Sequence, residues 1–250
     1  MGRRGQVSPH GSAGSGCQQD DFGPSAGYSH VVPSRRVYSL HELGTDTAVE
    51  MSEFIQLSSW NVQGKRYHDV HSVVCSLGID FHFMGLQEVL GFTFEGDDPL
   101  ATAVIDDVQY YAAKHSGCFS TLALAVDDVL APGLVASHVG HSHFSVNLSS
   151  DKLGRLIVAV VHLPHSKRPP SDLHDALQSL VDHLLPFSEK GYPMIVLGDF
   201  NDALEEDPRG DRSVAIGAAC QLLGLHKGSL SLLPTRVGSS SRLDHILYST

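Results

Sequence analysis

The chain has 250 residues, of which 42% are hydrophobic, so it is long enough to bury a large core in one α/β or β-rich domain. Its formal net charge of −11 excludes a general electrostatic attraction to polyanions, so a nucleic-acid contact would need a local basic patch or bridging cations. The four cysteines lie far apart, which predicts unpaired thiols rather than a zinc site or a disulfide scaffold. No pattern of a signal peptide or membrane span is present, and we expect an intracellular protein, cytoplasmic or nuclear.

Two regions differ in composition. Residues 1–52 are rich in Gly, Ser, His and Pro without sustained periodicity, which predicts a disordered leader. From Glu53 onward the pattern changes, and we expect one folded domain over residues 53–250. Ile55 and Leu57 alternate with polar residues up to Trp60, as in a half-buried strand.

The elements expected after this first strand alternate between helices and strands. An apolar stripe at Val70, Val73, Val74 and Leu77 predicts a helix that Gly78 closes. A second helix is expected between a Ser171 cap and Pro186. The expected strands are 81–89, 119–126, 134–139, 144–148, 156–162, 194–197 and 243–248, with a short helix at 213–223.

Polar side chains follow several of these strands directly. They are Asn61 after "LSSW", Glu88 in "GLQEV", His162 in "VVHLPH", Asp199 and Asn201 in "GDFN", and Asp244 in "SRLDHIL". Chemistry in α/β proteins is placed at such strand ends. Carboxylate and carboxamide oxygens suit Mg²⁺, with Mn²⁺ as the alternative ion, and do not suit zinc. The pattern predicts a Mg²⁺ site that neutralises phosphate charge while a carboxylate activates water.

The order and spacing of "WNVQG", "LQEV", "VVHLP", "VLGDFN" and "SRLDHIL" resemble the motifs of the endonuclease/exonuclease/phosphatase superfamily. The resemblance covers about residues 54–249, and "GDFN" with "RLDHIL" is its most specific part. It implies a four-layer α/β/β/α sandwich, in which two mixed β-sheets pack face to face with helices outside. It looks most like retrotransposon-type and abasic-site-type endonuclease domains.

The resemblance also implies a role for each matching residue. Asn61 and Glu88 look like the metal-site pair, with Glu88 as the direct carboxylate ligand. His162 stands where the family has a residue that stabilises the scissile phosphate or assists the leaving group. Asp199 resembles the residue that orients or deprotonates the attacking water, and Asn201 the residue that contacts phosphate oxygens. Asp244 resembles the carboxylate that orients a catalytic histidine.

The adjacent His245 is not that histidine. Strand alternation turns it to the face opposite Asp244, so we expect a packing residue. In the family a Ser-Asp-His motif and one further strand follow, and this sequence ends before them. The resemblance therefore predicts a sandwich without its last strand and a chain that is weakly active or inactive, since such groups contribute on the order of a hundredfold to ten-thousandfold in rate.

Three other segments have polar clusters. His165, Lys167 and Arg168 form a small basic loop after the His162 strand, which we interpret as a substrate-binding loop with a solvated loop as the alternative. His138, His141 and His143 have metal-like spacing, but a surface hairpin is the favoured interpretation. The acidic run Asp202, Glu205, Glu206, Asp207 and Asp211 predicts a solvated insertion.

The leading hypothesis is a Mg²⁺-dependent phosphodiester hydrolase, an endonuclease domain with nucleic acid as its substrate. One alternative is a phosphatase or lipid phosphodiesterase of the inositol 5-phosphatase or sphingomyelinase type, because the acidic balance suits a small phosphate ester. The other is a catalytically dead binding module. No sequence feature indicates an obligate protein partner.

Overall fold

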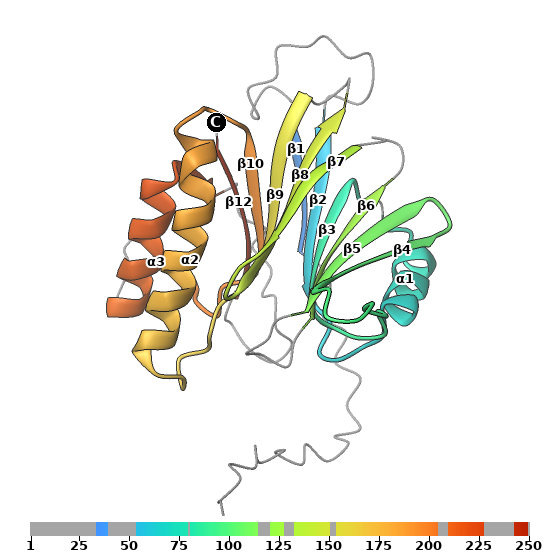
Figure 1. Ribbon diagram of the computed structural model, residues 1–250, viewed down its shortest axis with the longest axis horizontal. Coiled ribbons are helices and arrows are strands. Elements are labelled where there is room, and N and C mark those ends of the chain that lie inside the picture. The colour runs from blue at the N-terminus through green and yellow to red at the C-terminus, as the bar shows by residue number, and fades with distance from the viewer. Residues whose placement is uncertain are drawn as a thin grey trace, which may run out of the picture.

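The computed structural model describes residues 34–39, 54–79, 81–114, 121–127, 133–150, 154–204, 210–227 and 243–249. These residues form two six-stranded sheets with helices on their outer faces (Figure 1). The helices are α1 (Tyr67–Ser76), α2 (Pro170–Ser188) and α3 (Asp211–Leu222). The strands are β1 (Ser34–Ser39), β2 (Phe54–Asn61), β3 (Phe83–Val89), β4 (Leu100–Ile105), β5 (Val108–Lys114), β6 (Thr121–Asp127), β7 (Gly133–Val139), β8 (His143–Ser150), β9 (Gly154–His162), β10 (Met194–Asp199), β11 (Leu225–Lys227) and β12 (Asp244–Ser249).

Both sheets are mixed. The first has the order β1-β2-β3-β6-β5-β4 and the second the order β11-β12-β10-β9-β8-β7. In each sheet one central pair is parallel, β2 with β3 and β9 with β10, and the other pairs are antiparallel. Parallel strands end at the same edge of a sheet, so each parallel pair brings two strand ends together.

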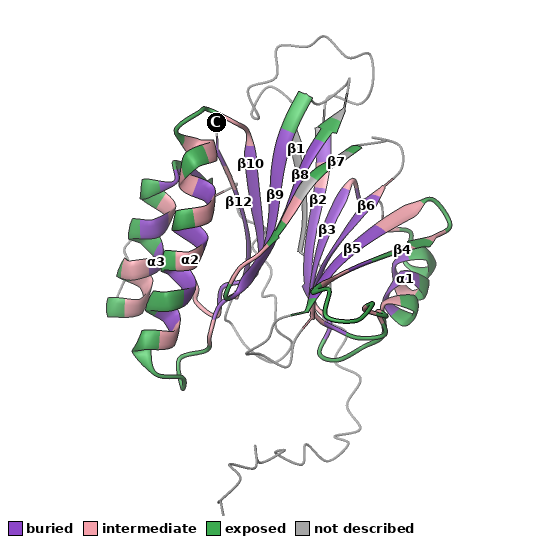
Figure 2. Cartoon of the chain, viewed as in Figure 1, coloured by how far each residue is buried: buried purple, intermediate pink, exposed green. Residues whose placement is uncertain are grey.

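Three apolar clusters separate four layers. Leu57 and Phe83 from the first sheet meet Val160 and Leu197 from the second in the core between the sheets. Helix α1 covers the outer face of the first sheet, and α2 and α3 cover the outer face of the second. The central strands are buried on both faces, as Figure 2 shows. The expected four-layer sandwich of two mixed sheets is therefore confirmed.

The helices differ from expectation in detail. Ser171 lies inside the first turn of α2 rather than capping it, and Pro186 lies inside that helix instead of ending it. The proline removes one backbone donor close to the end of the helix, while the buried face that includes Leu180 and Leu184 holds α2 on the sheet. Leu77 follows α1 as its C-terminal cap and is 60% exposed, whereas His71 joins Val70 and Val74 on the buried face.

Three strand regions were not expected from the sequence: β1, the β4–β5 hairpin and the short β11. Strand β1 lies within the segment 1–52 that we expected to be a leader, and it pairs antiparallel with β2. The rest of that leader, with Cys17, lies outside the described residues. Strands β4 and β5 form a hairpin whose turn is Asp106 and Asp107. No helix among the described residues combines the length and apolar character that a membrane crossing requires.

Candidate active site

Strand alternation brings three of the candidate side chains to the gap between the two sheets. Leu57 of β2 and Leu197 of β10 face the central core, so Asn61 and Asp199 lie on the same inner faces, where each strand ends. His162 follows Val160 on the inner face of β9 by the same rule. The two parallel strand pairs thus present their polar ends to one another across the sandwich.

Glu88 reaches the site in a different way. The register between β3 and β6 shifts between Leu86 and Val89, and Glu88 has a φ of 57° inside this irregularity. In regular alternation Phe83 faces the core, so Glu88 would face outward. A bulge inserts an extra residue and redirects a side chain, which is why bulges occur beside functional sites. Here the bulge turns the Glu88 carboxylate inward.

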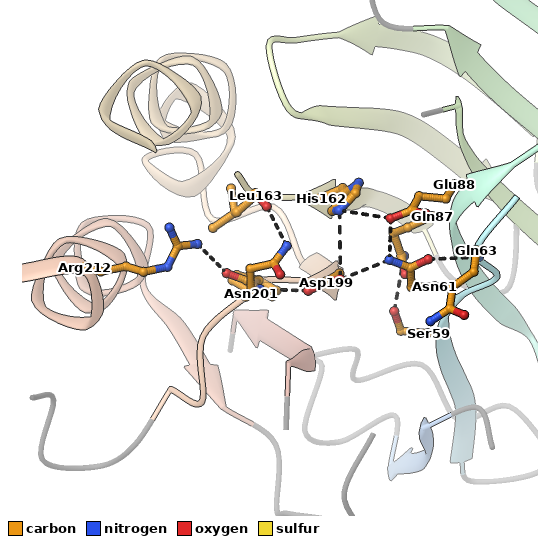
Figure 3. A network of polar contacts seen from close by, with 11 residues as sticks. Ser59, Asn61, Gln63, Gln87, Glu88, His162, Leu163, Asp199, Asn201 and Arg212 are labelled. Carbon is orange, nitrogen blue, oxygen red and sulfur yellow. Dashed lines mark hydrogen bonds and ion pairs between the residues drawn. The ribbon is translucent and has the colours of Figure 1, made fainter. Parts of the chain in front are cut away.

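The four side chains form one polar network, drawn in Figure 3. The Asn61 amide nitrogen donates to Glu88 Oε1 at 3.0 Å and to Asp199 Oδ2 at 3.1 Å. His162 Nε2 lies 3.6 Å from Glu88 Oε1 and 3.9 Å from Asp199 Oδ2. The Asn61 carbonyl oxygen accepts the backbone N–H of Gln63 at 3.1 Å, which fixes the orientation of the amide. Asn61, from the first sheet, is therefore hydrogen-bonded to one carboxylate from each sheet.

Asp199 is almost fully buried, with 6% of its surface exposed. Burial raises the pKa of its carboxyl group above the ordinary value, and His162, the Asn61 amide and the Asn201 backbone N–H oppose that rise. Nearby Glu88 adds a smaller upward contribution to the same pKa. A carboxyl group with a raised pKa is a stronger base once ionised, as acid–base catalysis at neutral pH requires.

Asn201 connects the ends of β9 and β10. Its backbone N–H donates to Asp199 Oδ1 at 2.8 Å, and its side-chain amide donates to the Leu163 carbonyl at 2.8 Å. Its φ is 49°, in the left-handed region that asparagine tolerates better than most residues. The side chain thus holds the Asp199 carboxylate and the turn after His162 in one arrangement.

Asp202 is not the solvated residue that the acidic run predicted. Both of its carboxylate oxygens accept from Ser213 Oγ, at 2.9 and 3.0 Å, and its side chain is 12% exposed. Arg212 lies 3.6 Å from the same carboxylate and donates to the Phe200 carbonyl at 3.0 Å. The sequence did not indicate these contacts, which connect the start of α3 to the segment that follows β10. Glu205, Glu206 and Asp207 lie outside the described residues.

Asp244 and His245 face opposite sides of β12. Asp244 pairs with Asp199 in the register of β10 and β12, and both are buried. His245 lies on the outer side, where its Nε2 contacts the Asp202 carbonyl at 2.7 Å and its ring meets Phe200 edge-on. Asp244 is thus beside the site, and His245 is a packing residue, as alternation predicts.

The basic loop follows β9 directly and is open to solvent. His165, Lys167 and Arg168 are all exposed. The Lys167 backbone N–H donates to His165 Nδ1 at 3.1 Å, and the Arg168 backbone N–H donates to the His165 carbonyl at 3.0 Å. These bonds give the loop a fixed turn, with its three basic side chains three to six positions after His162 in the sequence.

The histidine-rich segment forms the β7–β8 hairpin, but His143 is buried and not on the surface as expected. Among the described residues, His138, His141 and His143 do not form a group whose ligand atoms all lie within 4.8 Å of one another. The ring of His138 instead stacks on His183 of α2, with centroids 3.8 Å apart.

Sequence comparison identifies one family. A model of the Endonuclease/Exonuclease/phosphatase family matches residues 58–250, which include every residue of the polar network. Comparison with curated proteins found no match.

Solved structures share the fold at low sequence identity. The AP endonuclease LMAP from Leishmania major is 13% identical with a TM-score of 0.58, over 78% of this chain and 79% of that one. The endonuclease domain of TRAS1, a telomere-specific non-LTR retrotransposon, is 14% identical with a TM-score of 0.54, over 86% of this chain and 84% of that one. The 3′ phosphatase NExo from Neisseria, bound to a product DNA hairpin, is 14% identical with a TM-score of 0.53, over 77% and 86%.

Proposed function

The chain belongs to the endonuclease/exonuclease/phosphatase family, and on that basis we propose that it is a divalent-metal-dependent phosphodiester hydrolase that cleaves nucleic acid as an endonuclease. The observation that carries the proposal is the Asn61 bridge between Glu88 and Asp199, with His162 beside both carboxylates. The named activities of the similar structures, which include endonucleases and a DNA-bound phosphatase, support nucleic acid as the substrate.

The donor set fits Mg²⁺ or Mn²⁺. Glu88, Asp199 and Asp244 supply hard carboxylate oxygens and no thiolate, which is the chemistry these ions prefer. A phosphodiester would be repelled by these carboxylates unless a cation offset their charge. Glu88 would hold the ion directly, and Asn61 would orient the Glu88 carboxylate. When bound, such an ion neutralises phosphate charge and polarises the P–O bonds.

The remaining side chains have complementary roles in this proposal. Asp199 holds a water molecule and accepts its proton as the water attacks phosphorus. His162 donates a hydrogen bond from Nε2 to a phosphate oxygen. Asn201 uses one amide N–H for Leu163 and has a second for the phosphate. The P–O bond on the side opposite the attacking water breaks, and its leaving oxygen takes up a proton from solvent. The exposed Lys167 and Arg168 bind the flanking phosphates of a polymer.

The test is hydrolysis of three substrates with Mg²⁺: supercoiled plasmid, an abasic-site duplex and a small phosphate monoester. We expect slow cleavage of DNA, in keeping with the weak activity that the resemblance predicts, and Glu88→Gln and Asp199→Asn should lower kcat/KM further, on the order of a hundredfold to ten-thousandfold. The matched controls are Glu95→Gln and Asp175→Asn, which change the same charges at exposed positions and should retain activity.

The outcomes separate the alternatives. Hydrolysis of the monoester alone would replace the endonuclease proposal with a phosphatase. Binding of DNA and Mg²⁺ without turnover of any substrate would favour a catalytically dead module. DNA cleavage that Glu88→Gln and Asp199→Asn leave unchanged would contradict the assigned site.

A further inference from the structure

A second cluster of metal-ligating side chains lies on the outer face of the first sheet, where α1 crosses the β4–β5 hairpin. It consists of His71 and Cys75 on α1 and Asp106 in the hairpin turn. Each offers one ligand atom, and these atoms all lie within 4.8 Å of one another. The proposed hydrolytic site faces the opposite side of that sheet, so the cluster is not part of it.

Two spacings among the three atoms are close to those around a tetrahedral ion. His71 Nε2 lies 3.5 Å from Cys75 Sγ and 3.0 Å from Asp106 Oδ2. Zinc bond lengths place a nitrogen and a sulfur ligand about 3.5 Å apart, and a nitrogen and an oxygen ligand about 3.4 Å apart. Residues four apart on a helix share one face, so α1 presents His71 and Cys75 together. Small movements would bring all three atoms into ligating positions.

Two of the three ligands are held in place by their surroundings. His71 is 7% exposed, and its Nδ1 lies 2.9 Å from the hydroxyl of the buried Tyr110. Histidine ligands typically bond through the second ring nitrogen in this way, because that bond fixes the ring orientation and the tautomer. Asp106 has a φ of 49°, so the turn holds its carboxylate in a backbone conformation that few residues tolerate.

We propose that His71 Nε2, Cys75 Sγ and the Asp106 carboxylate bind a zinc-class divalent ion, with solvent as the fourth ligand. A mixed sulfur, nitrogen and oxygen set selects Zn²⁺ or Co²⁺ over Mg²⁺, so this site differs in ion from the proposed hydrolytic site. Cys75 and Asp106 are exposed, which gives the ion access from solvent. The bound ion links α1 to the β4–β5 turn and stabilises their contact.

The test is a Co²⁺ titration of the full chain, kept reduced with a phosphine. Co²⁺ bound by a thiolate gives a near-ultraviolet charge-transfer band, and competition with Zn²⁺ then gives the zinc affinity. We expect the band in the wild type and its loss in Cys75→Ser, a substitution at an exposed position that leaves the fold intact by circular dichroism. Asp106→Asn should weaken zinc binding at least about tenfold.

Two control variants locate the site. Asp107→Asn alters the neighbouring exposed carboxylate of the same turn and should bind zinc like the wild type. Glu88→Gln should also retain the band, because oxygen ligands alone do not produce it. The proposal is overturned if no band forms, if the band survives in Cys75→Ser, or if Asp106→Asn and Asp107→Asn bind zinc equally well.

Discussion

At the scale of single residues, the stacked imidazoles of His138 and His183 have a titration behaviour that depends on the fold. Burial lowers the pKa of His183 to about 4, and the charge of His138 contributes to that shift. Burial also lowers the pKa of His138 below its ordinary value of 6.5. The ring of His143 stacks against both of these rings. His138 and His183 line an open hollow of about 530 Å³, and the carboxylates of Asp175 and Asp182 line it with them.

This arrangement predicts a loss of stability in mild acid. The unfolded chain takes up protons on these rings near pH 6.5, whereas folded His183 does so only near pH 4. The contribution of these histidines to the free energy of unfolding is therefore complete above pH 6.5, and it declines as the pH falls toward 4. His183→Gln should flatten that decline in urea unfolding measured from pH 7.5 to 5. His174→Gln, at an exposed position of the same helix, is the control and should leave the free energy of unfolding as it is in the wild type at each pH; equal slopes for both variants would refute the assignment.

At the scale of elements, the contact between β9 and β10 depends on one glycine. Gly198 has a φ of 151°, and a Cβ atom added there would lie 2.0 Å from the Val161 backbone carbonyl oxygen. That oxygen belongs to the neighbouring parallel strand and cannot move without breaking the ladder. The glycine in "GDFN" thus allows the strand that carries Asp199 to pack beside the strand that carries His162.

Gly198→Ala should consequently lower the free energy of unfolding by roughly 2–4 kcal/mol, through strain and overpacking. Gly217→Ala is the matched control, because it lies in α3 with open space around the added methyl group. The control should raise stability by about 0.5–1 kcal/mol, since alanine favours helix more than glycine does. Chemical denaturation of both variants measures these changes in stability. Equal midpoints would show that a Cβ atom at Gly198 does not clash with the Val161 carbonyl oxygen.

The sequence was enough to predict strands where their apolar runs were long. "MIVLG" predicted a buried strand, and alternation alone was enough to direct Asn61, His162 and Asp199 inward. The β4–β5 hairpin was missed because each of its strands contains two alanines, which have little strand preference of their own. Glu88 faces the site only because of a bulge, and a bulge depends on the partner strand, which the local sequence does not describe.

At the scale of the whole molecule, the two sheets pack closely at Gly85, where a side chain is absent. A Cβ atom at Gly85 of β3 would lie 1.8 Å from Leu197 Cδ1 of β10 and 3.4 Å from Val160 of β9. Leu197 and Val160 are fully buried, so neither has free space to move into. The separation of the sheets at this point is set by the bare backbone of Gly85.

Gly85→Ala should destabilise the protein by about 1–3 kcal/mol, the usual cost of overpacking a core. Combining it with Leu197→Ala should cost less than the sum of the two single changes, because the shortened side chain makes room for the new methyl group. A double-mutant cycle in urea measures this coupling. Additive effects would mean that the two side chains do not compete for the same space.

The division of the strands between the sheets has one more consequence. Strands β1 to β6 make the first sheet and β7 to β12 the second, so the chain splits between residues 127 and 133 into two consecutive halves. Asn61 and Glu88 belong to the first half, and His162 and Asp199 to the second. Neither half alone can assemble the polar network. If the two were produced as separate polypeptides, the proposed hydrolysis would report directly on their reassociation, and the protein would serve as a split reporter.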